Sequence, residues 1–80
     1  MKKAIYQESY RALVATLRDT RHRQGLRQED VAGCLGVTRT WVSKVESCEL
    51  RMDMVQFVAL CRVLRVDASR LVRRLAQGAA

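Results

Sequence analysis

Four side chains that donate hydrogen bonds cluster in one short segment of this chain. They form two adjacent pairs about one helical turn apart, so a helix would present all four on one face: Arg39, Thr40, Ser43 and Lys44. Guanidinium, ammonium and hydroxyl groups recognise acceptors such as phosphate oxygens and the edges of nucleic-acid bases. The chemistry that this face predicts is therefore non-covalent recognition.

Covalent catalysis is not expected from this sequence. The chain has one histidine, and it carries neither a glycine-rich phosphate loop nor a Ser/His/Asp arrangement nor paired carboxylates in an apolar setting. Its three cysteines lack the C-x-x-C spacing of a zinc site. We therefore predict no enzyme activity, no metal and no cofactor.

The recognition face requires a helix, and the surrounding residues predict a pair of them. Val31, Ala32 and Leu35 repeat at helical spacing before Gly36, which can turn the chain with a positive φ. Thr38 can then cap a second helix, whose inward side chains are Val42 and Val45 and whose outer face is the polar one. Two helices joined by such a turn have the layout of a DNA-binding helix-turn-helix at about residues 28–46.

The chain resembles the lambda-repressor/Cro-like helix-turn-helix family, also called the Xre family. The resemblance covers about residues 11–75 and rests on five features in order: Gln28 to Ala32 as Q-x-x-x-A, the Gly36 turn, Ser43 to Glu46 as S-x-hydrophobic-E, the Asp53 helix start, and the closing stretch 60–75. It implies an all-α, compact five-helix lambda-repressor-like DNA-binding domain. Eighty residues make a single domain, 1–80.

The remaining helices follow from apolar spacing and from capping residues. A first helix is expected from near Gln7 to about Gln24, ended by Gly25. Asp53 begins the next helix, and a last helix at about 68–76 follows the break at Val66-Asp67. The expected inward residues of these helices, with two cysteines expected to be buried, are Tyr6, Tyr10, Leu13, Val14, Leu17, Phe57, Leu60, Leu64, Cys34 and Cys61.

Within the helix-turn-helix, each polar residue has an expected role. Arg39 is the best candidate base reader, because arginine can donate two bonds to O6 and N7 of one guanine. Thr40, Ser43 and Lys44 are expected to contact bases beside it, with a phosphate as an alternative target for Lys44. Gln28 matches the family glutamine that contacts a phosphate at the start of the second helix. The alternative is an ordinary solvated helix face.

Three further residues leave alternatives open or depart from the family pattern. Trp41 is expected at a phosphate, although its ring could lie on a thymine methyl or pack against the preceding helix. Arg27 stands where the family has a Ser or Thr cap; it cannot cap, but it can contact a phosphate. Cys48 stands where the family has a left-handed glycine, which predicts either backbone strain or a turn of another shape, and it leaves a thiol-sensing role open.

The charge of the chain favours the same kind of partner. Fifteen Lys and Arg against eight Asp and Glu give a formal net charge of +7 and a pI near 10.2. Such a chain is attracted to polyanions, so double-stranded DNA is the expected partner. The sequence has neither an apolar run long enough to span a membrane nor a signal peptide. We expect a cytoplasmic protein, encoded by a bacterium or a phage.

Taken together, these features predict a sequence-specific transcriptional regulator. The expected form is a homodimeric repressor that occupies a palindromic operator, because one small domain reads too few base pairs alone. The expected dimerisation residues lie on the last helix: Leu71, Val72 and Leu75. The alternative is that the leucines are used fully inside the monomer. The alternative is an antitoxin-type DNA-binding protein that also holds a partner toxin, and activation instead of repression also stays open.

Overall fold

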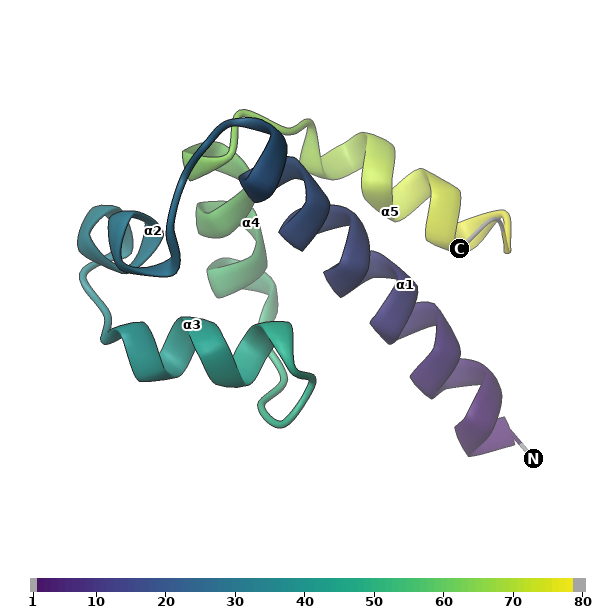
Figure 1. Cartoon of the computed structure of the whole chain (residues 1–80). Coiled ribbons are helices and arrows are strands. Elements are labelled where there is room, and N and C mark those ends of the chain that lie inside the picture. Colours follow the sequence, from purple (N-terminus) through teal and green to yellow (C-terminus); the bar gives the residue numbers. More distant parts are fainter. Residues whose placement is uncertain (1, 79–80) are drawn as a thin grey trace.

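Five α-helices make up the described part of the chain (Figure 1). The computed structural model describes residues 2–78, with side chains from residue 7 onward. The helices are α1 (Lys2–Arg23), α2 (Gln28–Leu35), α3 (Arg39–Glu46), α4 (Met54–Val63) and α5 (Ala68–Ala76). This confirms the predicted all-α, five-helix fold.

The first helix is longer than the sequence predicted. It begins at Lys2, five residues before the expected start at Gln7. The expectation was wrong because no glycine or proline interrupts residues 2–7, so nothing ends the helix there. Gly25 follows the helix with a φ of +70°, as predicted. In Figure 1 the N-terminal half of α1 extends away from the other helices.

The core forms where α1, α2, α3 and α4 meet, and α5 covers it with Leu71. The largest fully buried side chains are Val31, Val45, Cys61 and Leu64. Most of the predicted inward residues are confirmed as buried: Val14, Leu17, Val31, Ala32, Val42, Val45, Phe57, Leu60, Cys61 and Leu64. Tyr10, Leu13 and Leu35 are half-buried, and the Tyr6 side chain lies outside the described part. Cys34 was wrongly expected inside; it is exposed, because the two turns of α2 bury only Val31 and Ala32.

Side-chain hydrogen bonds cap the N-termini of three of the helices. The hydroxyl of Thr38 accepts the backbone N–H of Trp41 at 3.1 Å, and the carboxylate of Asp53 accepts that of Gln56 at 2.7 Å. Gln56 in turn accepts the N–H of Asp53 at 2.9 Å, which completes a capping box. Asp67 accepts backbone N–H groups of Ser69 and Arg70. The predicted caps at Thr38 and Asp53 are confirmed.

Candidate nucleic-acid interface

Helix α3 has two chemically different faces. Val42 and Val45 are buried, with exposed fractions of 3% and 2%. Arg39, Thr40 and Lys44 are exposed and Ser43 is half-buried. The four side chains predicted to contact bases therefore lie on one helix. The apolar face of this helix packs in the core, and its polar face is open to a ligand.

The turn between α2 and α3 sets the position of that helix. Gly36 has a φ of +72°, in the left-handed region that favours glycine. The backbone N–H of Val37 then bonds to the carbonyl of Ala32 at 3.0 Å, which ends α2 and directs the chain toward Thr38. Because only three residues separate α2 from α3, the turn places Arg39 and Thr40 in the first turn of α3, at an exposed helix N-terminus.

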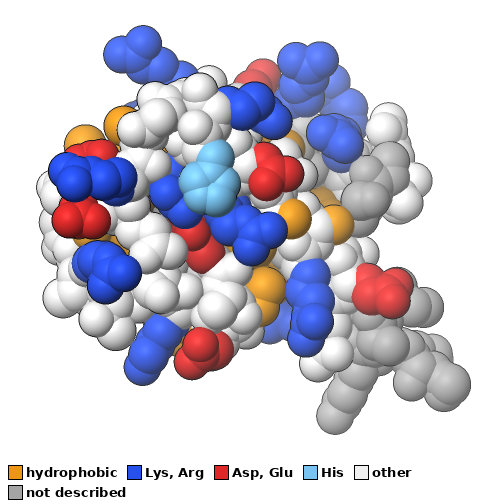
Figure 2. All heavy atoms as spheres, viewed as in Figure 1, with side chains coloured by type: hydrophobic (Ala, Val, Ile, Leu, Met, Phe, Trp, Pro, Cys, Tyr) orange, Lys and Arg blue, Asp and Glu red, His pale blue; other side chains and the backbone are white. Residues whose placement is uncertain are grey.

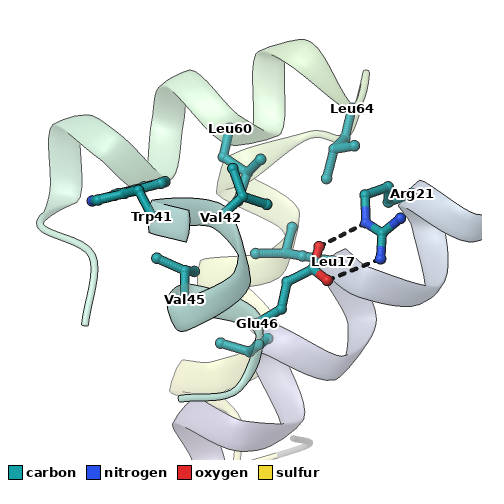
Figure 3. A pocket seen from close by; sticks show the side chains of 9 residues that line it. Leu17, Arg21, Trp41, Val42, Val45, Glu46, Leu60 and Leu64 are labelled. Atoms are coloured by element: carbon teal, nitrogen blue, oxygen red, sulfur yellow. Dashed lines mark hydrogen bonds and ion pairs between the residues drawn. The ribbon is translucent and has the colours of Figure 1, made fainter. Parts of the chain in front are cut away.

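An ion pair holds the other end of α3 to α1. Arg21 Nε donates to Glu46 Oε2 at 2.7 Å and Arg21 Nη2 donates to Oε1 at 2.9 Å (Figure 3). The side chains are only 9% and 13% exposed. Arg21 Nη1 also donates to the carbonyl of Leu26 at 2.8 Å, so one guanidinium connects α1, the loop before α2 and α3. This pair was not predicted from the sequence.

Gln28 belongs to the same network. Its amide Nε2 donates to Glu46 Oε1 at 2.9 Å, and the side chain is half-buried. An amide nitrogen has two hydrogens, so one remains to donate elsewhere. Glu46 thus fixes the orientation of the glutamine that was predicted to contact a phosphate, at the first residue of α2.

Arg27 precedes α2 with its side chain exposed. The guanidinium cannot accept a hydrogen bond, so it does not cap the helix, as the sequence predicted. Asp30 supplies the other half of a capping box, because its Oδ2 accepts the N–H of Arg27 at 2.8 Å. The same carboxylate oxygen lies 3.6 Å from Arg27 Nε. The Arg27 side chain is 73% exposed and that of Asp30 39%, so this ion pair adds little stability and leaves the guanidinium accessible.

Trp41 is partly buried against the core. Its ring borders a small apolar cavity together with Val42, Leu60 and the Arg21–Glu46 pair. In Figure 3 its indole nitrogen lies at the end of the ring that points away from this cavity. The ring thus borders the core beside residues of α1, α3 and α4, and this cavity includes no residue of α2, the helix against which packing was the alternative. The phosphate contact of the indole N–H stays a prediction.

The turn after α3 keeps the family geometry without the glycine. Cys48 has a φ of +64°, which confirms the left-handed alternative of the sequence analysis. Its N–H bonds to the carbonyl of Val45 at 3.1 Å, and the N–H of Glu49 bonds to that of Lys44 at 2.9 Å. Arg65, after α4, has a φ of +59° and was not predicted. Both residues carry the strain of a left-handed conformation.

Tyr10 fastens the segment between α3 and α4 to the first helix. Its hydroxyl accepts the N–H of Met52 at 3.2 Å and donates to the carbonyl of Leu50 at 3.4 Å. The guanidinium carbon of Arg51 lies 4.5 Å from the centre of the Tyr10 ring, a cation–π contact. These contacts hold the segment that follows α3 against α1.

Two groups near the start of α5 have shifted pKa values. Burial raises the pKa of the Cys61 thiol, and the charge of Asp67 raises it further. Cys61 therefore stays a neutral core residue, as expected. The pKa of Asp67 is lowered, first by the Ser69 hydroxyl and then by the backbone N–H of Arg70.

Basic side chains are spread over the molecular surface (Figure 2). Figure 2 shows them across one face of the molecule, with acidic side chains scattered between them. Among residues 7–78, no group of three or more His, Cys, Asp or Glu side chains is arranged to hold a metal ion. No helix in the described part of the chain combines the length and apolar character that crossing a membrane requires.

The three predicted dimerisation residues have different environments. Leu71 is 7% exposed and belongs to the core, so it offers almost no surface. Val72 is 44% exposed and Leu75 is half-buried. The structure thus removes Leu71 from the expected dimer surface, because the hydrophobic core already uses its side chain.

Comparisons with known proteins agree with this geometry. The family model described as a helix-turn-helix domain matches residues 12–75. A solved structure of an "XRE-family like protein" from Pseudomonas syringae pv. tomato strain DC3000 is similar at 33% sequence identity, with a TM-score of 0.88. The match covers 95% of this chain and 93% of that one. No curated protein matches the sequence.

Proposed function

The chain belongs to the XRE-like helix-turn-helix family of DNA-binding regulators, and we propose that it is a repressor that acts as a dimer. Its operator is a palindrome with two half-sites, each read by one α3. Occupancy of this operator in or beside a promoter excludes the polymerase. The observation that carries the proposal is the exposed polar face of α3 on a helix whose other face is buried.

Base reading is assigned to the first turn of α3. Arg39 is exposed, and it follows the Thr38 cap directly, so its guanidinium extends from the end of the helix that enters the major groove first. Two parallel donors fit O6 and N7 of a guanine. Thr40, Ser43 and Lys44 contact neighbouring bases from the same face, and their hydroxyl and ammonium groups can reach different acceptors.

Phosphate contacts come from the edges of the motif. The free hydrogen of the Gln28 amide and the first N–H groups of α2 meet one phosphate, and Arg27 lies beside them. The indole N–H of Trp41 provides a further donor. These contacts fix the register of α3 without reading sequence, and they make affinity dependent on salt.

Selection of bound duplexes from a random DNA pool tests the proposal. We expect enriched sequences with two inverted half-sites whose centres are about one helical turn apart, each containing a guanine. A pool that yields no preferred sequence, or a lone half-site, would contradict the dimeric operator. Repression itself is tested by a reporter gene placed behind the selected operator, whose output should fall when the protein is expressed.

A further inference from the structure

The outer face of α4 exposes large apolar side chains. Met54 is 71% exposed and Val55 is 78% exposed, the two highest values among the large apolar residues that the structure describes. Val58 continues the patch one turn later at 38%. With Ala59 and Arg62, these side chains line a shallow groove along the helix. We call these five residues the α4 patch.

The monomer does not use the α4 patch. The opposite face of α4 supplies Phe57, Leu60 and Cys61 to the core, and all three are buried. Exposed apolar side chains gathered on one helix face are typical of a surface that binds another protein.

Charges at the two ends of the α4 patch are self-complementary. Asp53 precedes the first turn of α4, and Arg62 lies in its last turn. One carboxylate oxygen of Asp53 caps the helix, while Oδ2 has no donor and Arg62 has no acidic partner among residues 7–78. A second α4 running in the opposite direction would bring each Arg62 toward the other copy's Asp53.

We propose that the α4 patch binds the same patch of a second copy of this chain, with the helices antiparallel and Val58 on the two-fold axis. The inference rests on the proposed function, because it names the surface that makes the dimer. An interface of this kind is isologous, so one patch serves both subunits. Ala59 beside the axis allows the two helices to approach closely, with Met54 and Val55 packed against the partner helix.

The last helix is a poorer surface for a second copy. Val72 is its exposed apolar residue, and the surrounding side chains of α5 are the exposed arginines Arg70, Arg73 and Arg74. Two such helices side by side would bring three arginines of each copy together, and Asp67 at the start of α5 would offset only part of that charge. The α4 patch avoids this repulsion, because each end meets the opposite charge.

The size of the α4 patch sets the expected strength of the dimer. A contact between two single helices lies at the low end of interface areas, so association should depend on protein concentration and strengthen on operator DNA. The segment 47–53 joins α4 directly to α3. Contact through α4 would therefore fix the spacing of the two recognition helices.

Analytical ultracentrifugation of matched arginine variants tests the surface. Val55→Arg places a charge in the α4 patch, and Val72→Arg places the same charge on α5; both positions are exposed, so both variants should fold. We expect Val55→Arg to raise the dimer dissociation constant at least about tenfold and Val72→Arg to change it less than about twofold. Wild-type protein that stays monomeric, or dissociation caused by Val72→Arg alone, would overturn the proposal.

Disulfide formation tests the two-fold axis. In a chain with Cys34→Ser and Cys48→Ser, Val58→Cys should cross-link to its own copy under mild oxidation, because a residue on the axis meets itself. Val72→Cys is the matched control and should cross-link more slowly; the reverse order would exclude the α4 axis. The Val55→Arg variant should still bind random duplex DNA. If the wild-type protein itself did not bind duplex DNA, the proposed function would be contradicted, but the α4 dimer would not.

Discussion

Helices α3 and α4 are successive, short and built by the same local devices, yet they present opposite surfaces. Each starts at a side-chain cap, Thr38 or Asp53, and each is followed by a non-glycine residue with positive φ, Cys48 or Arg65. Both bury one apolar face in the same core. The outer face of α3 is polar and cationic, whereas that of α4 is apolar.

This difference separates what folds the domain from what gives it a function. The caps, the turns and the inward residues determine that both helices form, and these features are of the same kind in α3 and α4. The solvent-facing residues determine what each helix can meet: Arg39 and Lys44 suit a polyanion, and Val55 suits an apolar protein surface. Substitutions at inward and outward positions should therefore have separable effects.

The largest effect is expected at the ion pair that anchors α3. Glu46→Ala removes the carboxylate from the nearly buried Arg21 and leaves its charge uncompensated, so unfolding should become easier by about 3–5 kcal/mol. Urea denaturation followed by circular dichroism measures this change. Glu49→Ala is the control, because Glu49 is exposed and its removal should change stability by less than about 0.5 kcal/mol.

Equal stability of the two variants would show that Glu46 does not anchor α3. A binding assay on the same Glu46→Ala variant tests Gln28, whose amide loses its acceptor when Glu46 is removed. In conditions where Glu46→Ala remains folded, binding to random duplex should weaken, because the orientation of the phosphate-contacting amide is no longer fixed.

A smaller effect is expected at the turns that end α3 and α4. Cys48→Gly and Arg65→Gly should each raise stability by about 1 kcal/mol, since glycine adopts a positive φ without strain and this gain exceeds its larger entropy loss on folding. Thermal unfolding under reducing conditions measures both. A lower melting temperature for either variant would mean that the native side chain at that position contributes more stability than the backbone strain costs.

The sequence predicted the parts of the fold that depend on local spacing. Val42 and Val45 lie three residues apart, Gly36 is a turn residue and Thr38 is a capping residue, so α3 and its inward face could be derived from neighbours in the chain. The predicted roles of its outward residues at DNA stay predictions. These roles depend on contacts with DNA, so a binding experiment is needed to test them.

The features that were missed depend on distant or unusual contacts. Arg21 and Glu46 are 25 residues apart, and either one alone is an ordinary charged residue; the only signal was that Arg21 continues the inward stripe of Leu17. The prediction that Cys34 is buried was wrong because residue spacing does not reveal how few side chains of a two-turn helix the other helices cover. Arg65 was missed because nothing in its residue type indicates a positive φ.

The smallest effect concerns the caps, and it extends the comparison to α5. Hydrogen bonds from Ser69 and Arg70 lower the pKa of Asp67 in the folded chain, so this cap stabilises the protein above the ordinary carboxyl pKa. That contribution is lost as the pH falls through the folded-state value. The Thr38 hydroxyl does not titrate there, so the cap of α3 should be insensitive to acid.

Melting temperatures of wild type and Asp67→Asn at about pH 6 and about pH 3 check this difference. Asparagine can still cap but does not titrate, so the variant should lose less stability on acidification than the wild type. Equal losses would show that the Asp67 carboxylate is not more favourably placed in the folded chain than in the unfolded one.

The central claim is that the polar face of α3 reads DNA sequence through Arg39. Fluorescence anisotropy with the selected operator and with a random duplex, at one salt concentration, tests it most directly. Arg39→Ala should weaken operator binding by about 1–3 kcal/mol while binding to random duplex hardly changes, whereas Arg27→Ala should weaken both alike. An unchanged ratio of operator to random affinity in Arg39→Ala would contradict the claim.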